Sequence, residues 1–180
     1  LGIELSSFLA IFSVAGIAVS LAVKDSLSNL AGGLTILGTK PFKVGDYVQI
    51  DDIEGTVQDI GLVYTSLTTW DNRRILVPNS TVVDAEVTNY TTEPLRRVDL
   101  TITASYGASV EEVKDVIQGV LARHDKVLKD PAPFARLSSY GDNALGYAVR
   151  AWCRTEDYWD VYYDLLEDFL CPYPGSFGFK

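Results

Sequence analysis

The chain has 180 residues, of which 47% are apolar and 22% charged, and its formal net charge is −9 at pH 7. This composition is typical of a folded protein and excludes a mainly disordered chain. The acidic balance argues against a nucleic-acid surface, which needs a basic patch to displace phosphate counterions.

The first 23 residues carry one ionisable side chain, Glu4, and are otherwise hydrophobic or small. As a helix this segment is about 30 Å long, which matches the hydrocarbon core of a bilayer. A transmembrane helix is therefore expected, with a buried core helix and a signal peptide as alternatives. A signal peptide would have a shorter apolar region preceded by positive charge. Because the chain begins at Leu1 without a methionine, we expect it to lie inside a longer protein.

Side chains on this helix sort into three stripes at helical spacing. One stripe is aliphatic and contains Val14, Ile17 and Leu21. Two flanking stripes are small, with Ala15, Ala18 and Ala22 on one face and Ser13, Gly16 and Ser20 on another. Small faces let helices approach closely in lipid. The pattern is typical of a helix packed on both sides by copies of itself, with the aliphatic stripe facing a shared axis.

A charged pair at residues 24–25 separates this apolar half from a second helical piece that is small and polar. Gly38 and Pro41 predict the end of the second piece, because glycine serves helix C-termini and proline cannot continue a helix. Lys40 and Lys43 flank this helix end, and lysines beside an apolar helix favour a cytoplasmic, anionic lipid surface. Residues 1–40 are therefore predicted to form one membrane-helix region.

Residues 41–91 change to short β-rich runs separated by acidic, glycine or asparagine turns. The runs cover residues 47–50, 55–60, 63–69 and 74–77. In the third run Thr65 and Leu67 alternate with Ser66 and Thr68, as in a strand with one buried face. The region is predicted to be a small β barrel or sandwich.

Residues 92–170 follow the order β-α-β-β-α, which is a ferredoxin-like plan. The expected strands cover residues 98–103, 134–139 and 145–153, and the expected helices start after Ser109 and near Asp157. Ser109 and Glu112 have the spacing of a capping box. The inward face of the last strand is expected to contain Leu145, Tyr147, Val149, Ala151 and Cys153. Residues 171–180 are expected to be a separate C-terminal segment.

No catalytic or metal-binding constellation is visible in the sequence. Cys153 and Cys171 do not make a disulfide framework in a chain of this length, and neither has a histidine at metal-ligand spacing. The single histidine, His124, is expected near a helix end, where a cation suits the helix dipole. The outer face of the last helix is interpreted as a solvated acidic surface, with Asp157, Asp160, Asp164, Glu167 and Asp168. We therefore expect no enzyme activity, no cofactor and no metal.

Three motifs follow one another at a characteristic spacing: SLSNL at residues 26–30, PF followed by GDYV at 41–48, and VPN at 77–79. They lie in the opening helix and in the stretches KPFKVGDYVQI and EGTVQDIGLVYTSLTTWDNRRILVPNS. Together these stretches resemble the small-conductance mechanosensitive channel (MscS) family, and the resemblance covers residues 11–169. It implies a kinked transmembrane pore helix, an Sm-like β domain, and a ferredoxin-like α/β domain that encloses a vestibule.

The resemblance also implies a homoheptamer in the bacterial inner membrane, with the β and α/β domains in the cytoplasm. Such a channel opens under membrane tension and passes ions and small solutes with low selectivity, which relieves hypoosmotic shock. Its partners would be identical subunits, membrane lipids and permeating solutes, and no nucleic acid. Family members normally carry at least two further membrane helices before the pore helix.

Carried over residue by residue, the two apolar rings that narrow the family's pore fall on Ile17 and Leu21. This agrees with the aliphatic stripe described above. The residues on which neighbouring pore helices pack correspond to Ala15, Gly16, Ala18, Ser20 and Ala22.

Two further family features concern the lower half of the helix. Asp25 stands where a family member has the glycine that kinks the helix. We therefore expect either that Asp25 ends one helix and caps the next, or that the break is shifted by a few residues. The second kink glycine corresponds to Gly33. A contact between the helix and the β domain maps to Asn29, with its partner at Asn79 or Ser80.

The C-terminus departs from the family pattern. The family's last helix runs on before it enters a strand built around a proline-aromatic-proline motif. Here Leu170 is followed at once by CPYP. We expect an omitted segment between Leu170 and Cys171, with residues 171–180 as a remnant of the terminal strand.

Two other classes of protein would explain only parts of the sequence. An RNA-binding Sm-like module would explain residues 42–91, but it explains neither residues 1–23 nor the acidic balance. A membrane-anchored enzyme would need a nucleophile with its base, or a metal cluster, and the sequence shows neither.

Overall fold

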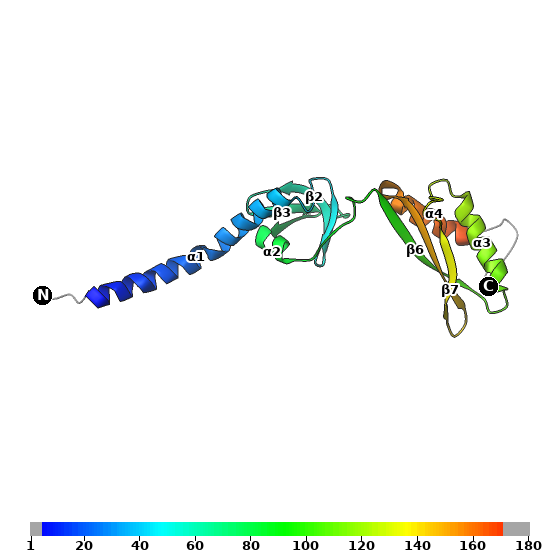
Figure 1. Ribbon diagram of the computed structural model, residues 1–180, viewed down its shortest axis with the longest axis horizontal. Coiled ribbons are helices and arrows are strands. Elements are labelled where there is room, and N and C mark those ends of the chain that lie inside the picture. The colour runs from blue at the N-terminus through cyan, green and yellow to red at the C-terminus, as the bar shows by residue number, and fades with distance from the viewer. Residues whose placement is uncertain (1–4, 171–180) are drawn as a thin grey trace. The chain divides into compact units, whose positions relative to one another are not determined.

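The computed structural model describes residues 5–170 and divides into two compact units between Thr92 and Glu93 (Figure 1). The tail at residues 171–180, where a strand remnant is expected, lies outside the described residues, as does the junction that follows Leu170.

The first unit combines one long helix with a five-stranded antiparallel sheet. Helix α1 spans Leu5–Thr39. The sheet has the order β4-β3-β2-β1-β5, and its elements are β1 (Tyr47–Ile50), β2 (Ile53–Ile60), β3 (Tyr64–Thr68), β4 (Arg74–Pro78), the short helix α2 (Asn79–Asp84) and β5 (Val87–Asn89). The four predicted strands are confirmed within two residues at each end. The three-residue strand β5 is too short to show a period in the sequence.

The core of the first unit joins helix and sheet. Ile36 of α1 and Phe42, which follows the helix, are buried together with apolar side chains of the sheet and α2, namely Val48, Ile50, Val57, Leu67, Val77 and Val82. The end of α1 is therefore part of the folded β domain. The prediction of a single buried face for β3 is wrong, because Ser66 is buried as well as Thr65 and Leu67. The Ser66 hydroxyl has a hydrogen-bond partner, because it accepts a hydrogen bond from Arg74 Nε at 2.7 Å.

The second unit has two layers. Its elements are β6 (Leu95–Ala104), α3 (Val110–Arg123), β7 (Phe134–Tyr140), β8 (Leu145–Arg154), a 3₁₀ turn (Thr155–Asp157) and α4 (Tyr158–Leu170). The sheet has the order β6-β8-β7 with antiparallel neighbours, and α3 and α4 pack on one face of it. The predicted order of two helices and three strands is confirmed.

The faces that form the core of the second unit follow from the sequence periods. All five predicted inward residues of β8 are buried. In α4 the buried side chains are Val161, Leu165 and Phe169, while Tyr158 and Tyr162 lie at the edge of the core. Helix α3 begins at the predicted place, but the Ser109 hydroxyl makes no capping hydrogen bond. The backbone N–H of Val113 donates to the Ser109 carbonyl instead, at 3.0 Å.

One polar atom in this core lacks a partner among the described residues. Tyr147 is fully buried on β8, and its hydroxyl makes no hydrogen bond there. An unsatisfied buried hydroxyl costs about 1–3 kcal/mol. We expect Tyr147→Phe to raise the midpoint of thermal unfolding, and Tyr140→Phe, at an exposed position, to leave it unchanged. A lower midpoint for Tyr147→Phe would show that the hydroxyl is bonded.

Candidate functional site: an exposed apolar helix docked on a β domain

Helix α1 has the length and composition of a membrane span. Residues Phe8–Thr39 form one apolar helical stretch, and residues 8–28 of this stretch are all exposed. A core helix of a soluble protein would be mostly buried, so that alternative is wrong. A removable signal sequence also fits poorly, because Ile36 of the same helix is buried in the β-domain core.

The N-terminal half of α1, which we call its upper half, carries the predicted stripes on its surface. Ile17 and Leu21 are 61% and 66% exposed, and Val14 on the same stripe is equally open. A Cβ added to Gly16 would meet no atom within 4 Å, so the small stripe beside them is also free within this chain. Such a surface has to be covered by lipid or by other helices.

The helix does not break where we expected. The prediction that Asp25 ends one helix and caps another is wrong, since α1 is helical without interruption from Leu5 to Thr39. Aspartate lowers the stability of a helix interior by less than about 0.7 kcal/mol. Its neighbours Ala22 and Leu27 are strong helix formers, so this penalty is too small to open the helix. The Asp25 carbonyl instead accepts a hydrogen bond from the Asn29 side chain at 2.9 Å.

The C-terminal half of α1, which we call its lower half, docks on the β domain through a stripe of four residues. Asn29, Gly32, Gly33 and Ile36 recur at helical spacing; Asn29 is half-buried and the other three are buried. We call these four residues the docking stripe. It meets the start of α2 and the turn between β2 and β3.

Two glycines let the helix backbone approach the β domain closely. A Cβ on Gly32 would lie 2.8 Å from the carbonyl oxygen of Asn79, and a Cβ on Gly33 would lie 2.7 Å from Asn79 Nδ2 and clash with the Leu62 carbonyl oxygen. Real Cβ atoms do not approach other heavy atoms this closely. Gly33, expected as a hinge, is therefore a point of close backbone contact inside a continuous helix.

Asn29 joins the docking stripe to α2. Its side-chain oxygen accepts two hydrogen bonds from Ser80, one from the backbone N–H at 3.0 Å and one from the hydroxyl at 2.9 Å. Of the two expected partners, Ser80 is the residue that bonds to Asn29.

Asn79 has a different position, because it holds the surface on which the helix rests. It is fully buried, and its side-chain oxygen accepts a hydrogen bond from the Thr65 hydroxyl at 2.8 Å. Its Nδ2 donates to the Gly61 carbonyl at 2.9 Å, and its backbone N–H donates to the Val63 carbonyl at the same distance. Three hydrogen bonds thus fix Asn79 beneath Gly33, and the surface has little freedom to move aside.

The two bonds at Asn29 allow a double-mutant test. Ser80→Ala removes the hydroxyl and keeps the backbone N–H, whereas Asn29→Ala removes the acceptor of both bonds. We expect Asn29→Ala to lower the free energy of unfolding by about 1–2 kcal/mol and Ser80→Ala by about half as much. The double variant should match Asn29→Ala, and Asn29→Asp should retain most of the stability. Additive losses in thermal or chemical unfolding would contradict a shared acceptor.

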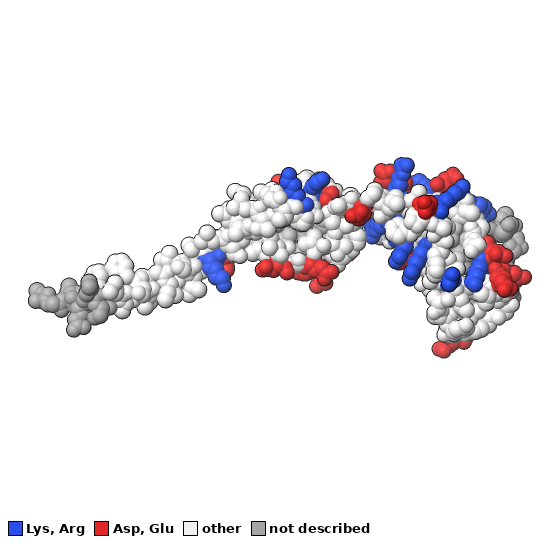
Figure 2. Space-filling view, viewed as in Figure 1, with Lys and Arg blue, Asp and Glu red and all other residues white. Residues whose placement is uncertain are grey.

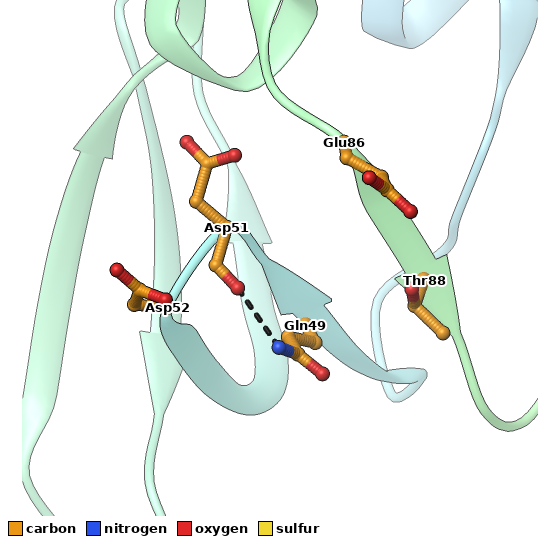
Figure 3. Close-up of a pocket in the computed structure, with 5 residues that line it drawn as sticks. All are labelled: Gln49, Asp51, Asp52, Glu86 and Thr88. Atoms are coloured by element: carbon orange, nitrogen blue, oxygen red, sulfur yellow. Dashed lines mark hydrogen bonds between the residues drawn. The ribbon is translucent and has the colours of Figure 1, made fainter.

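An acidic pocket on the β domain does not have the features of an ion-binding site. It is lined by Gln49, Asp51, Asp52, Glu86 and Thr88, and the Gln49 amide donates to the Asp51 carbonyl at 2.9 Å (Figure 3). Its three acidic residues are all exposed, and charged groups in contact with water need no bound ion. Across residues 5–170 no group of three or more metal-ligating side chains is close enough to hold a metal.

The acidic face of α4 is partly neutralised by a lysine from the neighbouring loop. Lys126 Nζ lies 2.7 Å from Asp160 and 3.0 Å from Asp157, and the hydrogen bond that Lys126 donates to the Asp160 carboxylate is the main cause that raises the pKa of Lys126. His124 directly follows α3, and its Nε2 is 3.4 Å from an Asp164 oxygen. These side chains tie α3 to α4 and have a structural function.

An exposed apolar helix docked on a small β domain, followed by a two-layer α/β unit, defines a class of membrane protein with large extramembrane domains. Residues 25–92 match the family described as mechanosensitive ion channel, beta-domain, and residues 98–168 match mechanosensitive ion channel MscS, C-terminal. The chain belongs to the MscS family of mechanosensitive ion channels.

Named relatives agree with this assignment. The chain is 37% identical to the small-conductance mechanosensitive channel of Edwardsiella ictaluri, over 86% of this chain and 54% of that protein. It is 32% identical to the small-conductance mechanosensitive channel of Helicobacter pylori strain UM084, over 87% of this chain and 57% of that protein. The chain thus spans between half and two thirds of the length of these relatives, which are channels and not enzymes.

Solved structures share the architecture. A crystal structure of Helicobacter pylori MscS in a closed state superimposes with a TM-score of 0.87 at 32% identity, over 92% of this chain and 66% of that one. A cryo-EM structure of Arabidopsis thaliana MSL1 has a TM-score of 0.80 at 24% identity, over 95% and 64%. The second likeness shows that the fold is shared.

Proposed function

We propose that this chain forms the pore and the cytoplasmic part of a channel that opens under membrane tension. Such a channel passes ions and small solutes with low selectivity and relieves hypoosmotic shock. The observation that carries the proposal is the construction of α1, which is exposed and apolar in its upper half and docked on the β domain in its lower half. One helix thereby links the membrane to a folded domain outside it.

The gate is proposed at Ile17 and Leu21. Both are exposed on the aliphatic stripe of α1. A narrow ring of aliphatic side chains gives water no hydrogen bonds, so the water column empties and ions cannot keep their hydration. Widening the ring under tension would let water and hydrated ions return.

The assembly is proposed to be a homoheptamer in which the small stripes of neighbouring pore helices meet. Ala15, Gly16, Ala18, Ser20 and Ala22 would be the contact residues. Small side chains allow close approach and low-friction sliding of helices in lipid. Cyclic symmetry would place every copy of the aliphatic stripe on one axis.

The membrane is proposed to be the bacterial inner membrane, with both folded units in the cytoplasm. Lys40 follows the apolar helix directly, and Lys43 comes shortly after it. Basic residues at this position favour the cytoplasmic leaflet and its anionic lipids.

Coupling between pore and β domain is proposed to run through the docking stripe. Asn29 is bonded to Ser80, and Asn79 supports the glycine contacts. A change in the tilt of α1 would have to break these contacts or carry the β domain along. The stripe would therefore influence how the channel closes.

A survival assay tests the physiological proposal. Cells that lack their own tension-gated channels are to be transformed with the full-length gene and diluted from high to low osmolarity. We expect expression to restore survival well above that of the empty vector. Equal survival of both strains, with the protein present in the membrane, would contradict the osmotic function.

A further inference from the structure

The outer face of the second unit's sheet carries an unusual concentration of arginine. Helices α3 and α4 cover one face, and the strand register places alternate residues of β6, β7 and β8 on the other. This outer face holds Arg97 and Asp99 of β6, Phe134 and Arg136 of β7, and Arg150 and Trp152 of β8. Basic side chains gather over these strands in Figure 2. The chain as a whole is acidic, so this face differs from its surroundings.

One of these arginines is neutralised within the sheet. The Arg97 guanidinium donates to both carboxylate oxygens of Asp99, at 2.6 and 2.8 Å. Asp99 also stands opposite Arg150 in the register, but both of its oxygens are bonded to Arg97. Asp99 makes no ion pair with Arg150, although the two residues stand opposite each other in the sheet.

Arg136 and Arg150 make no ion pair and no side-chain hydrogen bond within residues 5–170. Both contact the ring of Phe134, and each guanidinium carbon lies 5.5 Å from the ring centroid. The two cations are thus held beside one aromatic side chain, no more than twice that distance apart. A cation beside an aromatic face is stabilised by the ring quadrupole without any loss of its charge.

We propose that Arg136, Arg150 and Phe134 form a binding site for a small oxyanion that carries at least two negative charges. Two unpaired guanidinium groups on one face repel each other, and an anion between them removes the repulsion. Guanidinium groups match the oxygen pairs of phosphate and carboxylate groups. An anion with two charged groups can contact both cations at once. The site lies in the second unit and does not depend on how the channel opens.

A nucleic-acid partner is not favoured by the same surface. Phosphate-backbone binding needs a series of unpaired cations along the strand. This face offers two, and Arg97 is occupied by Asp99. A small dianion fits the number of free charges.

Titration with inorganic pyrophosphate tests the proposal on the intact channel in lipid nanodiscs. Calorimetry at fixed ionic strength should show one saturable site per chain. Arg136→Gln and Arg150→Gln should each weaken binding by about tenfold, because each removes one charge-assisted contact. Arg150→Lys, which keeps the charge but not the fork of donors, should fall between them and the wild type. A parallel titration with succinate shows whether phosphate or carboxylate groups are preferred.

Two control variants make the outcome decisive. Arg73→Gln removes an exposed arginine of the first unit and should leave the affinity unchanged. Asp99→Asn frees Arg97 from its partner and should tighten binding. Unliganded variants that melt at the wild-type temperature exclude misfolding as the cause. The proposal is overturned if neither anion gives saturable heat, or if both glutamine variants bind as tightly as the wild type.

Discussion

Replacing Leu21 by serine is expected to make the channel leak at rest and open at lower tension. The Leu21 side chain is exposed on the aliphatic stripe of α1, one turn below Ile17. Transfer of a leucine side chain from water to apolar surroundings is favourable by roughly 2 kcal/mol. A serine hydroxyl instead donates and accepts hydrogen bonds and keeps water in place. The closed state would lose its dry segment, and the barrier to ions would fall.

Patch recordings of the full-length channel measure this effect directly. Leu21→Ser should raise the resting conductance and shift the activation midpoint to lower suction. Val19→Ser provides a matched control, because two residues along a helix turn a side chain by about 200° and place Val19 away from the stripe. Equal resting conductance in Leu21→Ser and wild type would contradict a gate at Leu21. Equal leakage in both serine variants would contradict the orientation of the stripe.

Replacing Gly33 by alanine is expected to disrupt the docking of α1 on the β domain. The added Cβ would lie 2.7 Å from Asn79 Nδ2 and would clash with the Leu62 carbonyl oxygen. Leu62 contributes main-chain atoms, and Asn79 is fixed by three hydrogen bonds, so neither can yield cheaply. Overpacking of this kind costs about 1–3 kcal/mol. The Asn29–Ser80 bonds four residues away should weaken as the helix is pushed outward.

Gly38→Ala is the control for this experiment. It lies in the same helix, and a Cβ there would meet no atom within 4 Å. Alanine in place of a helical glycine is neutral or stabilises by up to about 1 kcal/mol. We expect a lower midpoint of thermal unfolding for Gly33→Ala and an unchanged or higher midpoint for Gly38→Ala. The close contact would be refuted if both variants unfolded at the wild-type temperature.

The strands and their buried faces could be predicted from the sequence wherever apolar and polar residues alternate regularly. The alternation of β8 identified five residues that are all buried, because one face of that strand packs on helices. β3 misled us at Ser66, since a buried serine can be satisfied by Arg74 from the next strand. A pairwise contact of that kind leaves no trace in a hydrophobic pattern.

The docking stripe and the residues of α2 that it contacts could be predicted only in part from the sequence. Asn29, Asn79 and Ser80 came from the family resemblance, but the period of α1 gives no hint that the Ser80 backbone N–H is the second donor. Gly33 was expected as a hinge, yet its close contact is with the Leu62 carbonyl, and the close contact of Gly32 is with the Asn79 carbonyl. Both carbonyls are distant from the helix in sequence. At Asp25 the sequence predicted a helix break that the structure does not have. Aspartate is a poor helix former, and we therefore expected the helix to end at Asp25. The loss of helix stability that aspartate causes is small compared with the cooperative stability of a long helix.

The most direct test of the central claim is the response of the full-length channel to membrane tension. The purified protein is to be reconstituted in liposomes, and excised patches recorded under increasing suction. We expect stepwise conductance that appears above a threshold of suction, with little preference between potassium and chloride. A protein that is inserted in the patch and carries no suction-dependent current up to membrane rupture would contradict the assignment of a tension-gated pore.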